Sequence, residues 1–96
     1  MSATADAPIR MTLEIVNDKG LHARASAKFV ETVERYDAAA QVSRDGLDVS
    51  GDSIMGLMML AAAKGTHIDV TVDGAEADAL AGALRDLVSG RFGESS

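Results

Sequence analysis

Apolar and polar residues alternate in two segments of the chain, a period that predicts half-buried β-strands. In the first segment, MTLEIV (11–16), Met11, Leu13 and Ile15 lie on one face. In the second, HIDVTVD (67–73), Ile68, Val70 and Val72 lie on one face and His67 lies on the other. We therefore expect a strand in each segment, with its apolar face on the core.

A hairpin is predicted between these two strands, in the segment AQVSRDGLDVSG (40–51). Its central Asp-Gly pair is typical of tight hairpin turns, because both residues tolerate a positive φ. Val42 before the turn, and Leu47 and Val49 after it, supply apolar positions for two short strands. The chain is thus expected to contain four strands.

Three further segments have the spacing of apolar residues that predicts an amphipathic helix. In the first, Phe29, Val33 and Tyr36 lie on one face. A short second helix is expected in IMGLMMLAAAKG (54–65), with Ser53 as its N-cap and a lysine and glycine at its end. The apolar face of the third helix consists of Ala77, Leu80, Ala81, Leu84, Leu87 and Val88.

The element order is therefore strand, helix, strand, strand, helix, strand, helix. The 96 residues suffice for one core, and three helices cannot cover both faces of a four-stranded sheet. The predicted fold class is α+β, an open-faced α/β sandwich with three helices on one face of a mainly antiparallel sheet. We expect the domain to span residues 9–91, with a flexible leader at 1–8 and a short tail at 92–96.

Composition and charge narrow the possible functions. The net charge of −6, from 15 acidic and 9 basic residues, disfavours nucleic acid and anionic membranes as partners. The absence of cysteine excludes disulfides and thiolate chemistry. The longest apolar run, residues 54–63, is about half a membrane span, and the first residues lack the apolar core of a signal peptide. These features favour a soluble protein of the cytoplasm, and nothing in the sequence requires more than a monomer.

His22 has the most distinctive chemical setting. It lies beside the expected helix start at Ala23, where first-turn N–H groups and the helix dipole favour an anion and disfavour a charged imidazole. Arg24 can bind phosphate oxygens at the same point, and Gly20 allows close approach of the backbone. These residues suit a neutral histidine that accepts a phosphoryl group and passes it on. On spacing alone, however, a lone histidine next to a helix start is more often a solvated or capping residue than a nucleophile.

The second predicted helix carries a second candidate site. Ser53 is expected first as an N-cap, but a phosphate there would also interact favourably with the helix dipole and could regulate partner binding. Ile54, Met55 and Met58 belong to an apolar set larger than one core face requires, so part of it is available as an adaptable docking surface. His67 has no second histidine or cysteine nearby, so the sequence predicts no metal site and no cofactor.

Two segments together resemble a known family. GLHARASAKFV (20–30) and DSIMGLMMLAAAKGT (52–66) resemble the active-site and regulatory-serine motifs of HPr, the histidine-containing phosphocarrier of the phosphoenolpyruvate-dependent phosphotransferase system. The resemblance covers about residues 9–90. It implies the βαββαβα sandwich that the periodicity predicts independently.

The resemblance also implies roles for individual residues. His22 is similar to the histidine that enzyme I phosphorylates on Nδ1 at the expense of phosphoenolpyruvate, and Arg24 to the active-site arginine. Ser53 is similar to the serine that an HPr serine kinase/phosphorylase modifies in many members. The chain would then carry phosphoryl groups to acceptor A-domains and would not be a turnover enzyme. The family's docking surface for enzyme I and the acceptors corresponds to Ala27, Ile54, Met55 and Met58.

The chain departs from the family pattern in two ways. Ala25 replaces the proline that usually follows the arginine, which restores a donor N–H in the first helical turn. Glu31, Glu34 and Asp52 lie in the neighbourhood where many sugar-system members carry lysines. This charge pattern leaves both a sugar and a nitrogen-related phosphotransferase system open.

Two other classes of function are compatible with parts of the sequence. A regulatory binding module would depend on the phosphorylation state of Ser53 and not on His22. A hydrolase with His22 as general base would need a paired nucleophile, for which the sequence shows no candidate.

Overall fold

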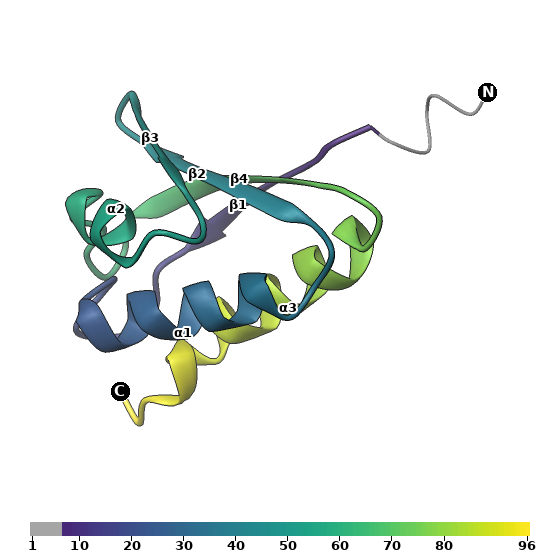
Figure 1. Ribbon diagram of the computed structural model, residues 1–96. Coiled ribbons are helices and arrows are strands. Elements are labelled where there is room, and N and C mark those ends of the chain that lie inside the picture. Colours follow the sequence, from purple (N-terminus) through teal and green to yellow (C-terminus); the bar gives the residue numbers. More distant parts are fainter. Residues whose placement is uncertain (1–6) are drawn as a thin grey trace.

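A computed structural model describes residues 7–96 of the protein (Figure 1). Most of the predicted leader at 1–8 therefore lies outside the described residues. In chain order the elements are β1 (Ile9–Glu14), α1 (Ala23–Glu34), β2 (Ala39–Arg44), β3 (Leu47–Ser50), α2 (Ile54–Met59), β4 (His67–Asp73), α3 (Ala77–Ser89) and the short 3₁₀ helix η2 (Arg91–Gly93).

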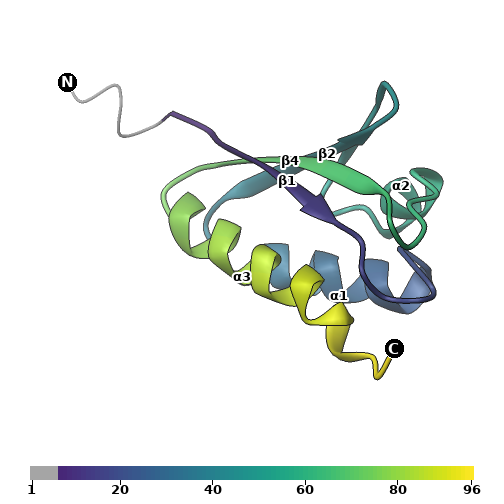
Figure 2. The same ribbon diagram turned by 180° about the vertical axis from the view of Figure 1, so that it is seen from behind.

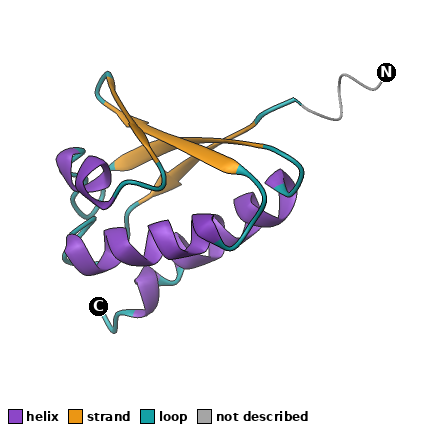
Figure 3. Cartoon of the chain, in the orientation of Figure 1, coloured by secondary structure: helices purple, strands orange, loops and turns teal. Residues whose placement is uncertain are grey.

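Within residues 7–96, four antiparallel strands form one sheet in the order β1-β4-β2-β3. The central strand β4 pairs with both neighbours, so that Val72 lies opposite Ile9 on β1 and Val70 lies opposite Val42 on β2. Figure 3 shows the strands as one layer with the long helices beneath it. The predicted α+β sandwich with the order βαββαβα is confirmed.

The core lies between the sheet and the two long helices, α1 and α3, which run side by side below one face of the sheet (Figures 1 and 2). The strand pattern is observed as predicted: Ile68, Val70 and Val72 are fully buried, and His67 is exposed. Charged residues of these helices, such as Glu31 and Glu34 on α1 and Asp78 and Arg85 on α3, are exposed. Other fully buried apolar side chains include Ile15, Phe29, Val42, Leu57, Leu80, Leu84 and Phe92.

The second helix is shorter than predicted. α2 ends at Met59, whereas the apolar pattern continued to Ala63. Ala61 has a φ of 51°, which is incompatible with a continuing helix. Ala62 is then buried, and its carbonyl oxygen accepts a hydrogen bond from the N–H of Leu21 at 3.0 Å. The helix ends early because the segment after it packs against the loop before α1.

Two other boundaries differ from the periodicity. β1 covers Ile9–Glu14 rather than 11–16. Ile15 lies beyond the strand but is fully buried, and its N–H donates to the carbonyl oxygen of Thr66 at 2.9 Å. α1 ends at Glu34, and Tyr36 packs half-buried against the core just after it.

The C-terminal residues do not trail off as the predicted tail at 92–96. After α3, residues 91–94 form a hook in which the side chain of Phe92 is fully buried. Lys28 on α1 donates from Nζ to the carbonyl oxygen of Phe92 at 2.6 Å. Burial of the aromatic ring helps offset the positive φ of 54° at this residue. This C-terminal hook (residues 91–94) lies beside the start of α1 (Figure 1).

No helix within residues 7–96 is long and apolar enough to cross a bilayer.

Candidate functional site

The loop before α1 is held in one conformation by tertiary contacts. Gly20 has a φ of +65°, and a Cβ at this position would lie 2.4 Å from the carbonyl oxygen of Ala62. That oxygen accepts the hydrogen bond from Leu21, and the side-chain amide of Asn17 donates to the carbonyl oxygen of Gly20 at 2.9 Å. Only glycine fits position 20, and the packed loop fixes the position of His22, two residues later, at the N-cap of α1.

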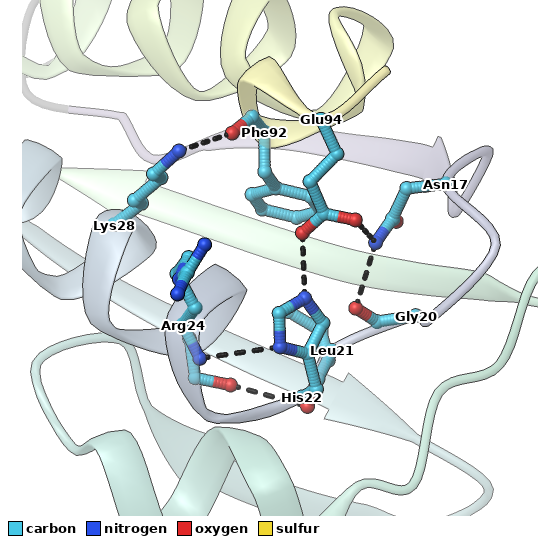
Figure 4. Close-up of polar contacts among 9 residues, drawn as sticks. Asn17, Gly20, Leu21, His22, Arg24, Lys28, Phe92 and Glu94 are labelled. Carbon is cyan, nitrogen blue, oxygen red and sulfur yellow. Dashed lines mark hydrogen bonds and ion pairs between the residues drawn. The ribbon is translucent and has the colours of Figure 1, made fainter. Parts of the chain in front are cut away.

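His22 is the N-cap of α1, as the sequence predicts. Its backbone is extended, and its side-chain Nδ1 accepts a hydrogen bond from the N–H of Arg24 at 3.3 Å. Nε2 lies 2.5 Å from Oε2 of Glu94 (Figure 4). Because an N–H faces Nδ1 and a carboxylate faces Nε2, the partners assign the hydrogen to Nε2 and a lone pair to Nδ1.

The second oxygen of Glu94 also has a partner. Oε1 accepts a hydrogen bond from Nδ2 of Asn17 at 3.0 Å, and Asn17 is fully buried. The hydrogen bond from His22 lowers the pKa of Glu94, the bond from Asn17 lowers it further, and burial opposes both effects. Glu94 is therefore ionised at neutral pH and carries a negative charge next to the imidazole.

His22 lines an open pocket together with Arg24, Lys19 and Glu94. Arg24 meets the imidazole through its main-chain N–H, while its exposed side chain extends beside the ring (Figure 4). Asp18, at the rim, is paired with Lys64 at 2.8 Å, and this hydrogen bond lowers its pKa. The pocket thus combines a nitrogen lone pair with two cationic side chains and the start of a helix, a combination that suits a phosphoryl group.

Ala25, which stands where the HPr motif usually has proline, is the third residue of α1 and is fully buried. It lies within the first turn, where backbone N–H groups have no acceptor one turn earlier. The structure therefore accommodates alanine here in regular helical geometry.

Ser53 lies at a separate helix start. It is the N-cap of α2, and its Oγ accepts a hydrogen bond from the N–H of Gly56 at 3.0 Å. Its side chain is half-buried. The N-cap role that the sequence predicts is observed, and the structure brings Ser53 to the apolar surface of α2 rather than into contact with His22.

The exposed apolar residues gather on α2. Met55 is 73% exposed, Ile54 is 40% exposed and Met58 is 43% exposed, whereas Leu57 is buried. Met59 belongs to the same apolar set but was not among the predicted docking residues, and it is 64% exposed on this helix. α2 packs against α1, on which Ala27 is half-buried (Figures 1 and 2). The predicted docking residues thus lie on two helices that are in contact.

Among residues 7–96, no three histidine, aspartate or glutamate side chains are placed so that they could hold a metal ion.

The chain matches a family model described as "PTS HPr component phosphorylation site" over residues 9–90. The chain belongs to the HPr family. Members of the family are phosphocarriers of the phosphotransferase system and are not turnover enzymes by themselves, and the family implies interaction with enzyme I and with phosphotransferase-system acceptors. The resemblance recognised in the sequence is confirmed.

Relatives cover nearly the whole chain. The phosphocarrier protein HPr of Neisseria meningitidis is 49% identical over 86 residues, which are 90% of this chain and 97% of that protein. HPr of Pseudomonas aeruginosa is 44% identical over 85 residues, 88% of this chain and 94% of that protein. The crystal structure of HPr-C-His from Thermoanaerobacter tengcongensis has a TM-score of 0.86 at 35% identity and covers 92% of this chain and 99% of that chain. Sequence and fold therefore agree on the HPr family.

Sequence reasoning missed two residues of the site, Asn17 and Glu94. Glu94 lies 72 positions from His22, in a segment that was expected to be a tail. One signal was present, because Phe92 is a large apolar residue in an otherwise small and polar terminus. A large apolar side chain is stabilised by burial, and the burial of Phe92 brings Glu94 to the imidazole.

Proposed function

We propose that this chain accepts a phosphoryl group on Nδ1 of His22 from phosphorylated enzyme I and passes it to acceptor A-domains of a sugar or nitrogen-related phosphotransferase system. The observation that carries the proposal is the Nδ1 lone pair, placed at the start of α1 beside an open pocket. Phosphoryl transfer requires a positioned nucleophile and charge compensation more than it requires other chemistry. The site supplies both.

The residues around Nδ1 have distinct roles in this proposal. The N–H of Arg24 contacts Nδ1 at a long distance of 3.3 Å, so it is released at little cost when the phosphorus approaches. It can then donate to a phosphoryl oxygen together with the other first-turn N–H groups. The exposed guanidinium of Arg24 supplies a bidentate cation for the same group.

Partner docking is assigned to the apolar surface formed by Ile54, Met55, Met58 and Ala27. These side chains combine exposure with flexibility, which suits a carrier that binds a donor and several acceptors in turn. The surface lies beside the N-terminal end of α1, so a partner seated on it would face His22 (Figure 2).

Phosphorylation of Ser53 is proposed as a regulatory event. A phosphate on Oγ would replace the N-cap hydrogen bond to Gly56 and place about two negative charges beside Ile54 and Met55. Desolvating such a charge on docking is costly, so modification is expected to weaken partners that use this surface. An HPr serine kinase/phosphorylase would be the modifying partner.

The test is incubation of the purified chain with enzyme I and phosphoenolpyruvate, followed by intact-mass measurement. We expect the mass of one phosphoryl group, lost on heating in acid and transferred to an added A-domain. His22→Ala should take up no phosphoryl group. His67→Ala is the matched control, because His67 is the other histidine and is exposed on β4. A phosphoryl group on the His22→Ala protein, or none on the unaltered chain, contradicts the proposal.

A further inference from the structure

The C-terminal hook carries a carboxylate to the imidazole of His22. Its position is fixed from two sides, because Phe92 is fully buried and Lys28 holds the main chain of the hook at 2.6 Å. A third contact joins a Ser96 main-chain oxygen to the N–H of Asp18 at 3.1 Å. The Glu94 side chain is only 18% exposed in this arrangement.

Both oxygens of Glu94 face N–H donors. Oε2 faces Nε2 of His22 at 2.5 Å, and Oε1 faces the Asn17 amide at 3.0 Å (Figure 4). Asn17 is itself oriented by its bond to the carbonyl oxygen of Gly20. The carboxylate thus has one orientation in which it satisfies the loop and the imidazole together.

We propose that Glu94 is a positioning residue for phosphoryl transfer, which holds His22 in the tautomer whose Nδ1 lone pair is available for attack. The inference rests on the proposed function of His22 and extends it to a residue that no local motif contains. A carboxylate that accepts from one imidazole nitrogen keeps the hydrogen there, so the other nitrogen carries the lone pair.

The charge balance of the transfer gives Glu94 a second effect. The Nδ1 lone pair forms the new nitrogen–phosphorus bond, and the electron pair of the broken bond returns to the donor group on enzyme I. Nε2 keeps its hydrogen, so the ring becomes positively charged in the phosphorylated state. The carboxylate beside Nε2 compensates that charge, and onward transfer returns the electron pair to Nδ1 and the ring to neutrality.

A purely structural role for Glu94 is the competing explanation. The hydrogen bonds to His22 and Asn17 would then serve only to hold the hook against the loop. In that case the loss of the carboxylate would lower stability without changing the distribution of the imidazole hydrogen. The two roles therefore differ in a spectroscopic property of His22.

Glu94→Gln separates the two roles, because an amide offers one oxygen and one NH₂ group where the carboxylate offers two oxygens. If the amide oxygen faces Asn17, the NH₂ group faces Nε2 and favours hydrogen on Nδ1. If the amide oxygen faces Nε2 instead, the NH₂ group of the glutamine lies against the NH₂ group of Asn17, and neither can accept a hydrogen bond from the other. The glutamine therefore cannot reproduce both contacts, although it preserves the shape of the side chain.

The experiment measures the His22 tautomer by ¹⁵N NMR and the phosphorylation rate with enzyme I and phosphoenolpyruvate on the full chain. In the unaltered protein we expect hydrogen on Nε2. In Glu94→Gln we expect a larger population with hydrogen on Nδ1 and phosphorylation slower by about tenfold, the scale of one charge-assisted hydrogen bond. Glu14→Gln, the same chemical change at an exposed carboxylate on β1, is the control and should match the unaltered protein.

An unchanged tautomer or an unchanged rate in Glu94→Gln overturns the positioning role. If the tautomer is unchanged and thermal unfolding shows a loss of stability, the role of Glu94 is purely structural. Failure of the proposed function has a different signature, since the unaltered chain would then remain unphosphorylated whatever its tautomer.

Discussion

Gly20→Ala tests how strictly the loop before α1 is specified by its contact with the segment after α2. The new Cβ would lie 2.4 Å from the carbonyl oxygen of Ala62 and 3.0 Å from the Cα of Ala63. These neighbours are backbone atoms, so the overlap is relieved only by moving one chain segment away from the other. Such a movement breaks the hydrogen bond from Leu21 to Ala62.

The magnitude follows from three contributions. A left-handed φ of +65° costs an alanine about 1–2 kcal/mol. The lost hydrogen bond costs about 1 kcal/mol, and the displaced packing around Leu21 about 1 kcal/mol more. We therefore expect a loss of about 3–4 kcal/mol in the free energy of unfolding.

Gly65→Ala is the matched control for backbone strain. Gly65 has a φ of +90°, but a Cβ there meets nothing within 4 Å. This variant should lose only the strain of about 1–2 kcal/mol. Urea denaturation of both variants measures the difference, and equal destabilisation would refute the steric argument. Phosphorylation by enzyme I should be impaired in Gly20→Ala alone, because only that change moves His22.

Three further predictions concern other parts of the site. The hydrogen bond from His22 lowers the pKa of Glu94 below its ordinary value of 4.5, so the stabilising contribution of this carboxylate is present above pH 4.5 and is lost as the pH falls through the folded-state pKa. Urea denaturation between pH 3 and 7 should therefore show a smaller loss of unfolding free energy on acidification in Glu94→Gln than in the unaltered chain. Ser53→Ala removes the N-cap of α2 and should cost about 1 kcal/mol in the free energy of unfolding, measured by thermal denaturation, while a cost near zero would contradict the capping role. Met55→Ser should change stability by less than about 0.5 kcal/mol but weaken binding to enzyme I in calorimetric titration, whereas Leu57→Ala should cost about 2–5 kcal/mol because that side chain is buried; equal binding by Met55→Ser and the unaltered chain would remove Met55 from the docking surface.

Local spacing predicted much of the fold because the relevant interactions are local. Alternation at Ile68, Val70 and Val72 determines which face of β4 is apolar, and the buried face in the structure is that one. The start of α1 was predicted at Ala23 for a similar reason, since an N-cap bonds to residues only two or three positions away. The adjacency of His22 and Arg24 follows directly from these short separations.

The end of α2 shows where local patterns fail. Apolar residues continue to Ala63, so nothing near Met59 indicates a helix end. The end is set by Ala62, whose carbonyl oxygen bonds to Leu21 about forty positions earlier in the chain. A contact between two loops has no period in the sequence.

The sequence by itself determined the class of fold, the position of His22 at a helix start and the membership of the HPr family, because strand alternation, helix capping and contiguous motifs depend on neighbouring residues. Only the tertiary structure placed a carboxylate beside Nε2 of His22. Glu94 reaches the imidazole because burial of Phe92 folds the C-terminal hook onto the start of α1. The contact exists only after packing has brought the two ends of the domain together, so its energy is a property of the closed fold and not of either segment.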